Sequence, residues 1–376
     1  MTSSQHADNR FYLYGSPVSF YTVKVRSYLH YKGLPFVEVR ATNKISKEFI
    51  EPATGGWRVI PVLKTPQGHC IQDSSIILDE LESAYTDRSI TPPGLKQQVV
   101  SSLFELLGDE WLVFPAMHYR WNFKKYNLKY ILNAFGQSRS PHWPKAVRFL
   151  GGIMPALIFG NVPRFMLGIN KKNSPALEAW TQQLLDQLDI HFSKYNYLLG
   201  ARACYGDFAV YGPLHAHLAL DPYPKEHLIK SRKNVIAWLE RMDKTPKKIG
   251  DWLPNDDIPA TLIPILHSQC QDQLPCIHRL MDKTRDWINK HPAEITLPRF
   301  IGKVDYQING AEGKRLCTPY TQWMYERVLA PIHAAVEPQR AELTQWLSQQ
   351  NIPFKPIQPK DSLVFRQSRL WRKAKL

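Results

Sequence analysis

The sequence predicts an α/β N-terminal domain of βαβ-ββα order, followed by a large all-α domain that continues into a C-terminal extension. In the first ninety residues, short apolar runs of strand length alternate with apolar residues at helical spacing, and afterwards the helical spacing dominates. The chain has 376 residues, more than one ordinary domain. We expect a disordered N-terminus over 1–10, the α/β domain over 11–90, the helical domain over 95–254 and a mostly helical extension over 255–376.

The first half of the α/β domain predicts a strand, a helix and a second strand. Residues 11–14 are apolar and aromatic, and residues 15–17 break this run before apolar positions repeat at helical spacing over 18–29. Gly33 ends the helix, and residues 36–39 form the next strand. This order implies a parallel, right-handed crossover.

The second half predicts an antiparallel hairpin and a closing helix. Residues 59–63 and 70–71 are the two strands, with turn residues at 65–68 between them. A helix follows over 74–85, and the proline-rich residues 91–94 predict a linker. The resulting βαβ-ββα order is the plan of a thioredoxin-like domain.

The rest of the chain predicts mostly helices. Residues 297–306 are compatible with a strand, and we find no internal repeat. Apolar stripes at helical spacing run over 103–114, 177–195, 207–220, 235–242, 273–289 and 320–347.

The chain is basic, with a formal net charge of +15 and a pI near 9.5. Such a charge attracts anionic ligands and also occurs in nucleic-acid-binding proteins. The sequence has no helix-turn-helix, zinc-finger or RNA-binding signature, so we do not expect nucleic acid as a partner. Its five cysteines are scattered without CxxC spacing, and residues 1–10 are polar. We therefore expect a reduced, cytoplasmic protein without a signal peptide.

Residues 149–168 form the most apolar stretch of the chain. Pro155, Pro163 and Arg164 interrupt it, so we do not expect a membrane-spanning helix. We expect core packing or an apolar pocket wall instead. Flanking basic residues leave a peripheral membrane contact as the alternative. These are Lys145, Arg148, Lys171 and Lys172.

The first ninety residues resemble the N-terminal domain of glutathione S-transferases. The strand over 11–14, the turn over 15–22, the Pro61 segment and the pair Asp73-Ser74 come in the order found in that family. The resemblance implies a domain that holds glutathione as a co-substrate, without a metal. It also implies a homodimer.

A second likeness lies in residues 198–208, which resemble the start of a capped helix in the family's all-helical domain. Cys204 stands where that family usually has Ser or Thr, and Asp207 holds the acidic position three residues on. Because cysteine is a poor cap, we expect a weakened capping box. Residues 255–376 carry no comparable likeness.

The resemblance makes Ser19 the first candidate for catalysis. In serine-type members, a hydroxyl just before the first helix donates a hydrogen bond to the glutathione sulfur. This bond and the positive helix N-terminus both favour the thiolate, which is the nucleophile. The alternative is that Ser19 only caps the helix. Tyr14 is the second candidate, because other members of the family place a catalytic tyrosine at the end of the first strand. The other hydroxyl side chains near this turn are those of Ser16, Tyr21 and Thr22.

Five residues are the predicted glutathione-binding set: Ile60, Pro61, Gln72, Asp73 and Ser74. We expect a cis bond before Pro61, which would turn the main chain of Ile60 toward the cysteinyl part of glutathione; a trans proline at a strand start is the alternative. The helix expected over 74–85 starts with free N–H groups, which suit the γ-glutamyl carboxylate. Asp73 can pair with the γ-glutamyl amine, and Gln72 can assist in binding this group. Plain helix capping is the alternative for Asp73 and Ser74.

An aromatic cluster predicts the wall of a substrate pocket between the two domains, formed by Trp111, Phe114, His118 and Tyr119. Core packing is the alternative for each of them. No metal-ligand spacing occurs, so we expect no metal. The sequence thus predicts a glutathione transferase that activates the glutathione thiol for attack on an apolar electrophile. The alternative is a non-catalytic protein of the same fold that serves binding or assembly, including at a membrane surface.

Overall fold

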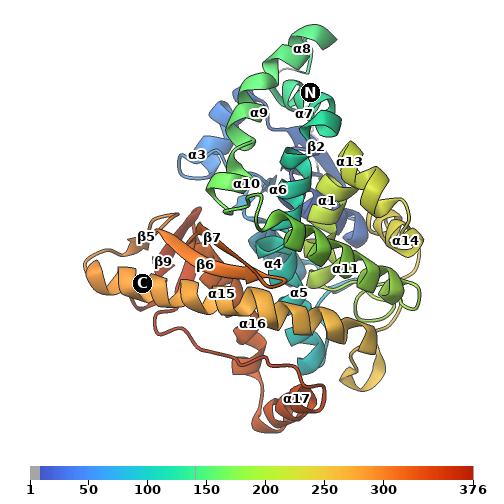
Figure 1. Ribbon diagram of the computed structural model, residues 1–376, viewed down its shortest axis with the longest axis vertical. Coiled ribbons are helices and arrows are strands. Elements are labelled where there is room, and N and C mark those ends of the chain that lie inside the picture. The colour runs from blue at the N-terminus through green and yellow to red at the C-terminus, as the bar shows by residue number, and fades with distance from the viewer. Residues whose placement is uncertain (1–8, 140, 376) are drawn as a thin grey trace, which may run out of the picture.

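The fold agrees with the predicted class: a thioredoxin-like domain followed by a large helical region. The computed structural model describes residues 9–139 and 141–375. Most of the expected disordered N-terminus, residues 1–8, lies outside the described part. In Figure 1 the N-terminal strands (blue) lie behind the helices, and the C-terminal extension (orange to red) covers one side of them.

The N-terminal domain has one four-stranded sheet of order β2-β1-β3-β4. Strand β1 pairs parallel with β2, and β3 pairs antiparallel with both β1 and β4, as the βαβ-ββα prediction requires. Short helical turns bridge β2 and β3. The elements are β1 (Phe11–Gly15), α1 (Phe20–Lys32), β2 (Phe36–Arg40), α2 (Asn43–Ile45), α3 (Glu51–Ala53), β3 (Val62–Lys64), β4 (Cys70–Gln72) and α4 (Ser74–Ala84).

The helical region begins with the long helix α5, which packs against α12 along most of its length. In Figure 1 the short helix α8 forms the top of the molecule, and α9 and α10 lead down from it toward α6. The elements are α5 (Leu95–Glu110), α6 (Val113–Asn122), α7 (Lys124–Arg139), α8 (Lys145–Gly151), α9 (Ile153–Phe159), α10 (Val162–Phe165), α11 (Ser174–Phe192), α12 (Tyr205–Pro213), α13 (Pro222–Pro224) and α14 (Lys233–Met242).

The C-terminal extension combines three helices with two small antiparallel sheets. The strand expected within 297–306 is part of a hairpin, which strands β6 and β7 form. A separate sheet of order β5-β9-β8 places Thr296 and Leu297 beside the last strand, β9. The elements are α15 (Ile263–Lys290), β5 (Thr296–Leu297), β6 (Lys303–Ile308), β7 (Ala311–Leu316), α16 (Pro319–Ala334), α17 (Glu337–Gln349), β8 (Leu363–Arg366) and β9 (Arg369–Arg372).

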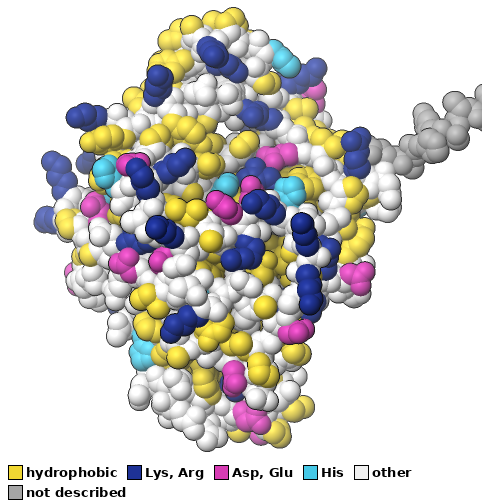
Figure 2. Space-filling model, turned by 90° about the vertical axis from the view of Figure 1, so that its right-hand side faces the viewer, with side chains coloured by type: hydrophobic (Ala, Val, Ile, Leu, Met, Phe, Trp, Pro, Cys, Tyr) yellow, Lys and Arg dark blue, Asp and Glu magenta, His cyan; other side chains and the backbone are white. Residues whose placement is uncertain are grey.

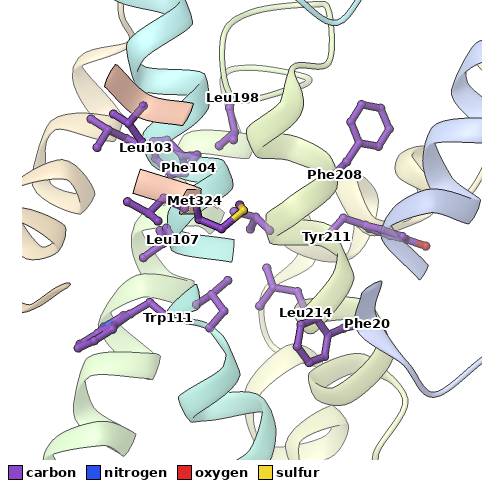
Figure 3. Close-up of a cluster of buried hydrophobic side chains, with 14 of the residues drawn as sticks. Phe20, Leu103, Phe104, Leu107, Trp111, Leu198, Phe208, Tyr211, Leu214 and Met324 are labelled. Atoms are coloured by element: carbon purple, nitrogen blue, oxygen red, sulfur yellow. The ribbon is translucent and has the colours of Figure 1, made fainter. Parts of the chain in front are cut away.

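A single hydrophobic core joins all three parts of the chain. Leu103, Phe104 and Leu107 of α5 face α12, and Phe20 of α1 reaches the same cluster (Figure 3). Met324 of α16 enters it from the extension (Figure 3). The extension therefore completes the core of the first two parts rather than hanging from them.

The acidic half of the capping box at the start of α12 is formed. The Cys204 N–H donates to Asp207 Oδ2 (2.9 Å), while the Asp207 N–H donates to the main-chain oxygen of Cys204 (3.0 Å) and the Cys204 side chain makes no capping hydrogen bond. Asp207 Oδ1 also accepts from the Leu198 N–H (3.1 Å) and from the Trp238 indole (3.2 Å). The aspartate thus holds most of this junction, which limits the consequence of having cysteine at the cap.

The expectation that residues 149–168 pack in the core is wrong for most of this stretch. Leu150, Leu157 and Ile158 are each more than 60% exposed. Only its last part fits the alternative of an apolar pocket wall, because Met166 and Leu167 line the cavity described below. A helix can be apolar and yet face outward, which composition alone does not reveal.

Candidate functional site

A cavity of about 860 Å³ lies between the N-terminal sheet, the start of the helical region and the extension. Its wall is mostly apolar and is interrupted by polar groups of the N-terminal domain, by Asp109 and Glu110 of α5, and by arginines of the extension. This size is typical of small-molecule sites. The wall includes Tyr21, Trp57, Val59, Ile60, Pro61, Gln72, Asp73, Ser74, Asp109, Glu110, Val113, Val162, Met166, Leu167, Leu297, Arg299, Arg315, Tyr320, Phe365, Ser368 and Arg369.

All five residues of the predicted glutathione-binding set line this cavity: Ile60, Pro61, Gln72, Asp73 and Ser74. The Ile60–Pro61 bond is cis, as expected. Strand β3 begins only at Val62, so Ile60 lies just outside its ladder, at the cavity wall. The structure thus brings together two segments that the sequence separates by about ten residues.

Asp73 is the N-cap of α4 and has a positive φ of 86°. Its Oδ1 accepts from the N–H groups of Ser75 (2.9 Å) and Ile76 (3.3 Å). Asp73 therefore caps α4, which is the alternative role expected for it. Its Oδ2 accepts from the Tyr320 hydroxyl (2.7 Å). Burial raises the pKa of Asp73, and the Tyr320 hydrogen bond opposes this rise. Both carboxylate oxygens are therefore engaged before any ligand arrives.

The extension also engages Gln72. The Ser368 hydroxyl donates to Gln72 Oε1 (2.8 Å) from the turn between β8 and β9. Tyr320 and Ser368 thus hold two side chains that we predict to face the γ-glutamyl group. Sequence reasoning missed both contacts, because 247 and 296 residues separate the partners.

Among the described residues, the cavity wall includes the hydroxyl of Tyr21 but neither Ser19 nor Tyr14. Ser19 is the N-cap of α1, and its side chain makes no capping hydrogen bond. Tyr14 stacks on Phe49 with ring centroids 4.0 Å apart. The Tyr21 hydroxyl donates to the main-chain oxygen of Asp109 (3.1 Å). The Ser16 N–H donates to Thr22 Oγ1 (3.3 Å), so these two hydroxyl residues form a local turn contact.

The four residues expected to line the substrate pocket lie in the core instead: Trp111, Phe114, His118 and Tyr119 are at most 2% exposed. Trp111 and Phe114 pack against each other, with ring centroids 4.8 Å apart. His118 Nε2 lies 2.8 Å from Glu178 Oε1, and burial lowers the pKa of this histidine. The apolar wall of the cavity comes from other residues, chiefly Val113, Val162, Met166, Leu167 and Leu297.

Acidic side chains at the end of α5 face the cavity beneath the predicted binding set. Burial raises the pKa of Glu110 to about 7, and the positive charge of Arg315 opposes this rise. Glu110 also accepts from the Thr321 hydroxyl. Its protonation therefore changes near neutral pH, inside the cavity. The sequence offered no signal for this, since Glu110 follows an ordinary helical pattern.

A buried ion-pair network supports this side of the cavity. Lys24 Nζ donates to Asp109 Oδ2 (2.6 Å), Glu105 Oε1 (3.0 Å) and Ser75 Oγ (2.9 Å). Arg327 Nη2 adds a second cation to Glu105 Oε2 (3.2 Å). The network ties α1, α4, α5 and α16 together directly behind the start of α4. Within residues 9–139 and 141–375, no group of three or more His, Cys, Asp or Glu side chains is placed to hold a metal ion.

A thioredoxin-like sheet with a cis-proline beside β3 and a helix start in the same cavity wall defines the class of this domain. Residues 13–89 match the family model for the glutathione S-transferase N-terminal domain, so this part of the chain belongs to that family. A comparison with curated proteins gave no match.

Several solved structures are similar to this chain at low identity. The β-etherase LigF from Sphingobium sp. strain SYK-6 is 15% identical, with 63% of this chain and 96% of that one covered and a TM-score of 0.44. A glutathione S-transferase from Rhodospirillum rubrum F11 is 15% identical, with 66% and 96% covered and a TM-score of 0.41. A glutathione transferase homologue from Drosophila mojavensis, with bound glutathione, is 18% identical, with 63% and 89% covered and a TM-score of 0.36.

Proposed function

We propose that the protein is a glutathione transferase that binds glutathione beside β3 and α4 and transfers its sulfur to an apolar electrophile. The observation that carries the proposal is the shared cavity. One wall holds the five residues of the predicted glutathione-binding set, and the opposite wall offers apolar side chains. The family of residues 13–89 supports glutathione as the ligand.

The binding step follows from charge and hydrogen bonding. Glutathione is an anion, and Arg299, Arg315 and Arg369 are in the lining of the cavity. In the N-terminal turn of α4, Asp73 takes the N–H groups of Ser75 and Ile76, which leaves the main-chain N–H and the hydroxyl of Ser74 for the γ-glutamyl carboxylate. Ile60 lies where its main chain can pair with the cysteinyl part of the tripeptide.

The chemical step needs a hydroxyl near the sulfur. We propose Ser19 as the donor, because its hydroxyl makes no capping bond and stands at the positive start of α1, although Ser19 is not part of the cavity wall. Tyr21 is the second candidate, because it lines the cavity, although its proton is held by the Asp109 carbonyl oxygen. The thiolate then attacks the electrophilic carbon and forms a carbon–sulfur bond, and the leaving group departs with the electron pair of the broken bond.

The test compares Ser19→Ala with Tyr21→Phe, using glutathione and chlorodinitrobenzene. We expect Ser19→Ala to lower kcat/KM about tenfold or more with glutathione binding retained, and Tyr21→Phe to change it less than about threefold. The reverse ranking would assign the role to Tyr21. A wild-type protein that neither binds glutathione nor reacts would overturn the proposal.

A non-catalytic protein of this fold is the second candidate function, and one observation favours it. Tyr320 and Ser368 already hold Asp73 and Gln72, as an occupied site would. Glutathione binding without turnover of any electrophile would support this candidate. We also propose a homodimer and a cytoplasmic location, which light scattering and cell fractionation would test.

A further inference from the structure

We propose that the surface formed by α8, α9 and α10 docks on an anionic phospholipid bilayer and lies in its interface. Ten of the eighteen exposed large hydrophobic side chains among the described residues fall between positions 143 and 165. We call these ten side chains the apolar patch. Its six most exposed members are at least half exposed: Leu150, Met154, Leu157, Ile158, Phe159 and Phe165. Water-exposed apolar area of this density marks an interaction surface.

The charges around the apolar patch select an anionic bilayer as the partner. Residues 111–177 contain ten Lys or Arg and no Asp or Glu. Lys129 on α7, Lys145 on α8 and Arg164 on α10 are all exposed. At the end of the molecule formed by α7 to α9, the top of Figure 2, apolar side chains lie among lysines and arginines. An apolar face ringed by cations fits acidic headgroups, whereas a second copy of the chain would bring the same cations together.

The apolar patch is a formed surface, because α8 and α9 are held closely against α7. A Cβ added at Gly136 would lie 1.8 Å from the Arg148 carbonyl oxygen, and one at Gly152 would lie 2.1 Å from that of Leu132. Ala156 is buried in a small core with Trp121 and neighbours from α7. Phe159, on the edge of the apolar patch, stacks on Phe135 of α7 with ring centroids 5.6 Å apart.

The arrangement favours lying in the interface over crossing the bilayer. The segment Lys145–Phe165 is long and apolar enough to span, but it is mostly exposed and lies in mid-chain, unlike a core helix or a signal sequence. Crossing would require it to leave α7 and would bury Arg164 in hydrocarbon. Short helices with an apolar outer face and a basic rim suit the headgroup boundary.

Docking would bring one wall of the cavity to the bilayer. Val162 and Met166 line the cavity, while Phe165 between them is 65% exposed on the apolar patch. The Met166 carbonyl oxygen accepts from the Leu316 N–H (2.7 Å), which fixes this end against the extension. The electrophile would then be a lipophilic compound drawn from the membrane. This consequence rests on the proposed function, whereas the docking itself does not.

Vesicle flotation of the full chain tests the docking without glutathione or catalysis. Vesicles of phosphatidylcholine alone are compared with vesicles that also contain phosphatidylglycerol. We expect binding to the anionic vesicles, weakened at high salt, and at least a tenfold loss in the double variant Leu157→Gln/Ile158→Gln. Ile190→Gln is the matched control, since Ile190 is 56% exposed on α11, outside the apolar patch.

Charge reversal provides a second comparison. Lys129→Glu/Lys145→Glu should lower binding to anionic vesicles at least tenfold, and Lys247→Glu/Lys248→Glu, with the same charge change elsewhere on the surface, should lower it less. Unchanged thermal melting of the variants would show that they are folded.

Three kinds of result would overturn the proposal. One is failure of the wild type to float with anionic vesicles, or equal flotation of the apolar-patch variant. Another is a dimer, seen by light scattering, that Leu157→Gln/Ile158→Gln dissociates without any vesicle binding, which would assign the apolar patch to a second copy. The third is resistance of the bound protein to alkaline carbonate extraction, which would indicate a spanning segment.

Discussion

Replacing Tyr320 with phenylalanine removes the hydroxyl that holds Asp73 and keeps the ring. The lost bond is short, 2.7 Å, and its acceptor is a carboxylate of which only 9% is exposed. Hydrogen bonds to charged groups contribute about 1.5–3 kcal/mol to stability. Because Asp73 faces the cavity, water can replace part of this bond in the variant. We therefore expect Tyr320→Phe to lower the free energy of unfolding by about 1–2 kcal/mol.

The same change should strengthen glutathione binding. In the wild type, a ligand ammonium group must share Asp73 Oδ2 with the Tyr320 hydroxyl, and in the variant that oxygen is available. A gain of about 1 kcal/mol corresponds to roughly fivefold tighter binding. Isothermal titration of glutathione measures the affinity, and urea unfolding measures the stability.

Tyr325→Phe is the matched control, because Tyr325 lies on the same helix, is fully buried and does not line the cavity. Its hydroxyl donates to the neutral Lys355 carbonyl oxygen at 3.3 Å and accepts from the Ile357 N–H at 3.1 Å. We expect the loss of these two neutral bonds to cost about 1–3 kcal/mol of stability and to leave glutathione affinity unchanged. If Tyr320→Phe binds glutathione no more tightly than Tyr325→Phe, Asp73 does not receive the γ-glutamyl amine.

Three further changes test the surroundings of the cavity. Glu110, whose pKa is about 7, loses its proton as the pH rises and adds a negative charge to the cavity. S-methylglutathione, an anion, should therefore bind several-fold more weakly at pH 8 than at pH 6. Titration calorimetry should show that Glu110→Gln flattens this pH dependence. Lys24→Met leaves Glu105 and Asp109 buried without their shared cation, so urea unfolding should show a loss of about 3–5 kcal/mol in the free energy of unfolding. Arg26→Met is the control, because its ion pair with Glu38 is partly exposed, and it should lower the free energy of unfolding by less than about 1 kcal/mol. Asp207→Ala removes the acceptor of three buried N–H groups and should lower the free energy of unfolding by about 3 kcal/mol or more. A loss below about 1 kcal/mol would show that Cys204 alone caps α12.

The parts of the fold that follow from local pattern were predictable from the sequence. Short apolar runs of strand length, the glycine after α1 and the proline at position 61 act over a few residues, so the βαβ-ββα order can be read directly. Asp73 before a helical pattern is likewise a local capping signal. These short-range rules account for the N-terminal wall of the cavity.

The part of the cavity wall that the extension supplies was out of reach, because it depends on contacts across the chain. Nothing near Tyr320 or Ser368 in sequence indicates that they would meet Asp73 and Gln72. Lys24 was a missed signal, since a lysine on the same helical stripe as Tyr21 and Tyr28 predicts a buried charge that needs partners. A second missed signal was the long acid-free run around residues 149–168. High hydropathy alone cannot separate a buried helix from an exposed one, whereas one-sided charge beside it points outward.

The extension is best understood as part of the site. Arg327 of α16 forms an ion pair with Glu105, which also pairs with Lys24, and a second ion pair with Asp79 on α4 (2.5 Å). The carboxylates behind the start of α4 therefore balance their charge with one cation from α1 and one from the extension. Without Arg327, Glu105 would keep only part of the compensation that its burial demands. Since Tyr320 lies two turns earlier on the same helix, the contact that stabilises this buried charge also fixes the hydroxyl that competes for Asp73. Stability of the fold and access to the predicted ligand group are thus coupled through α16.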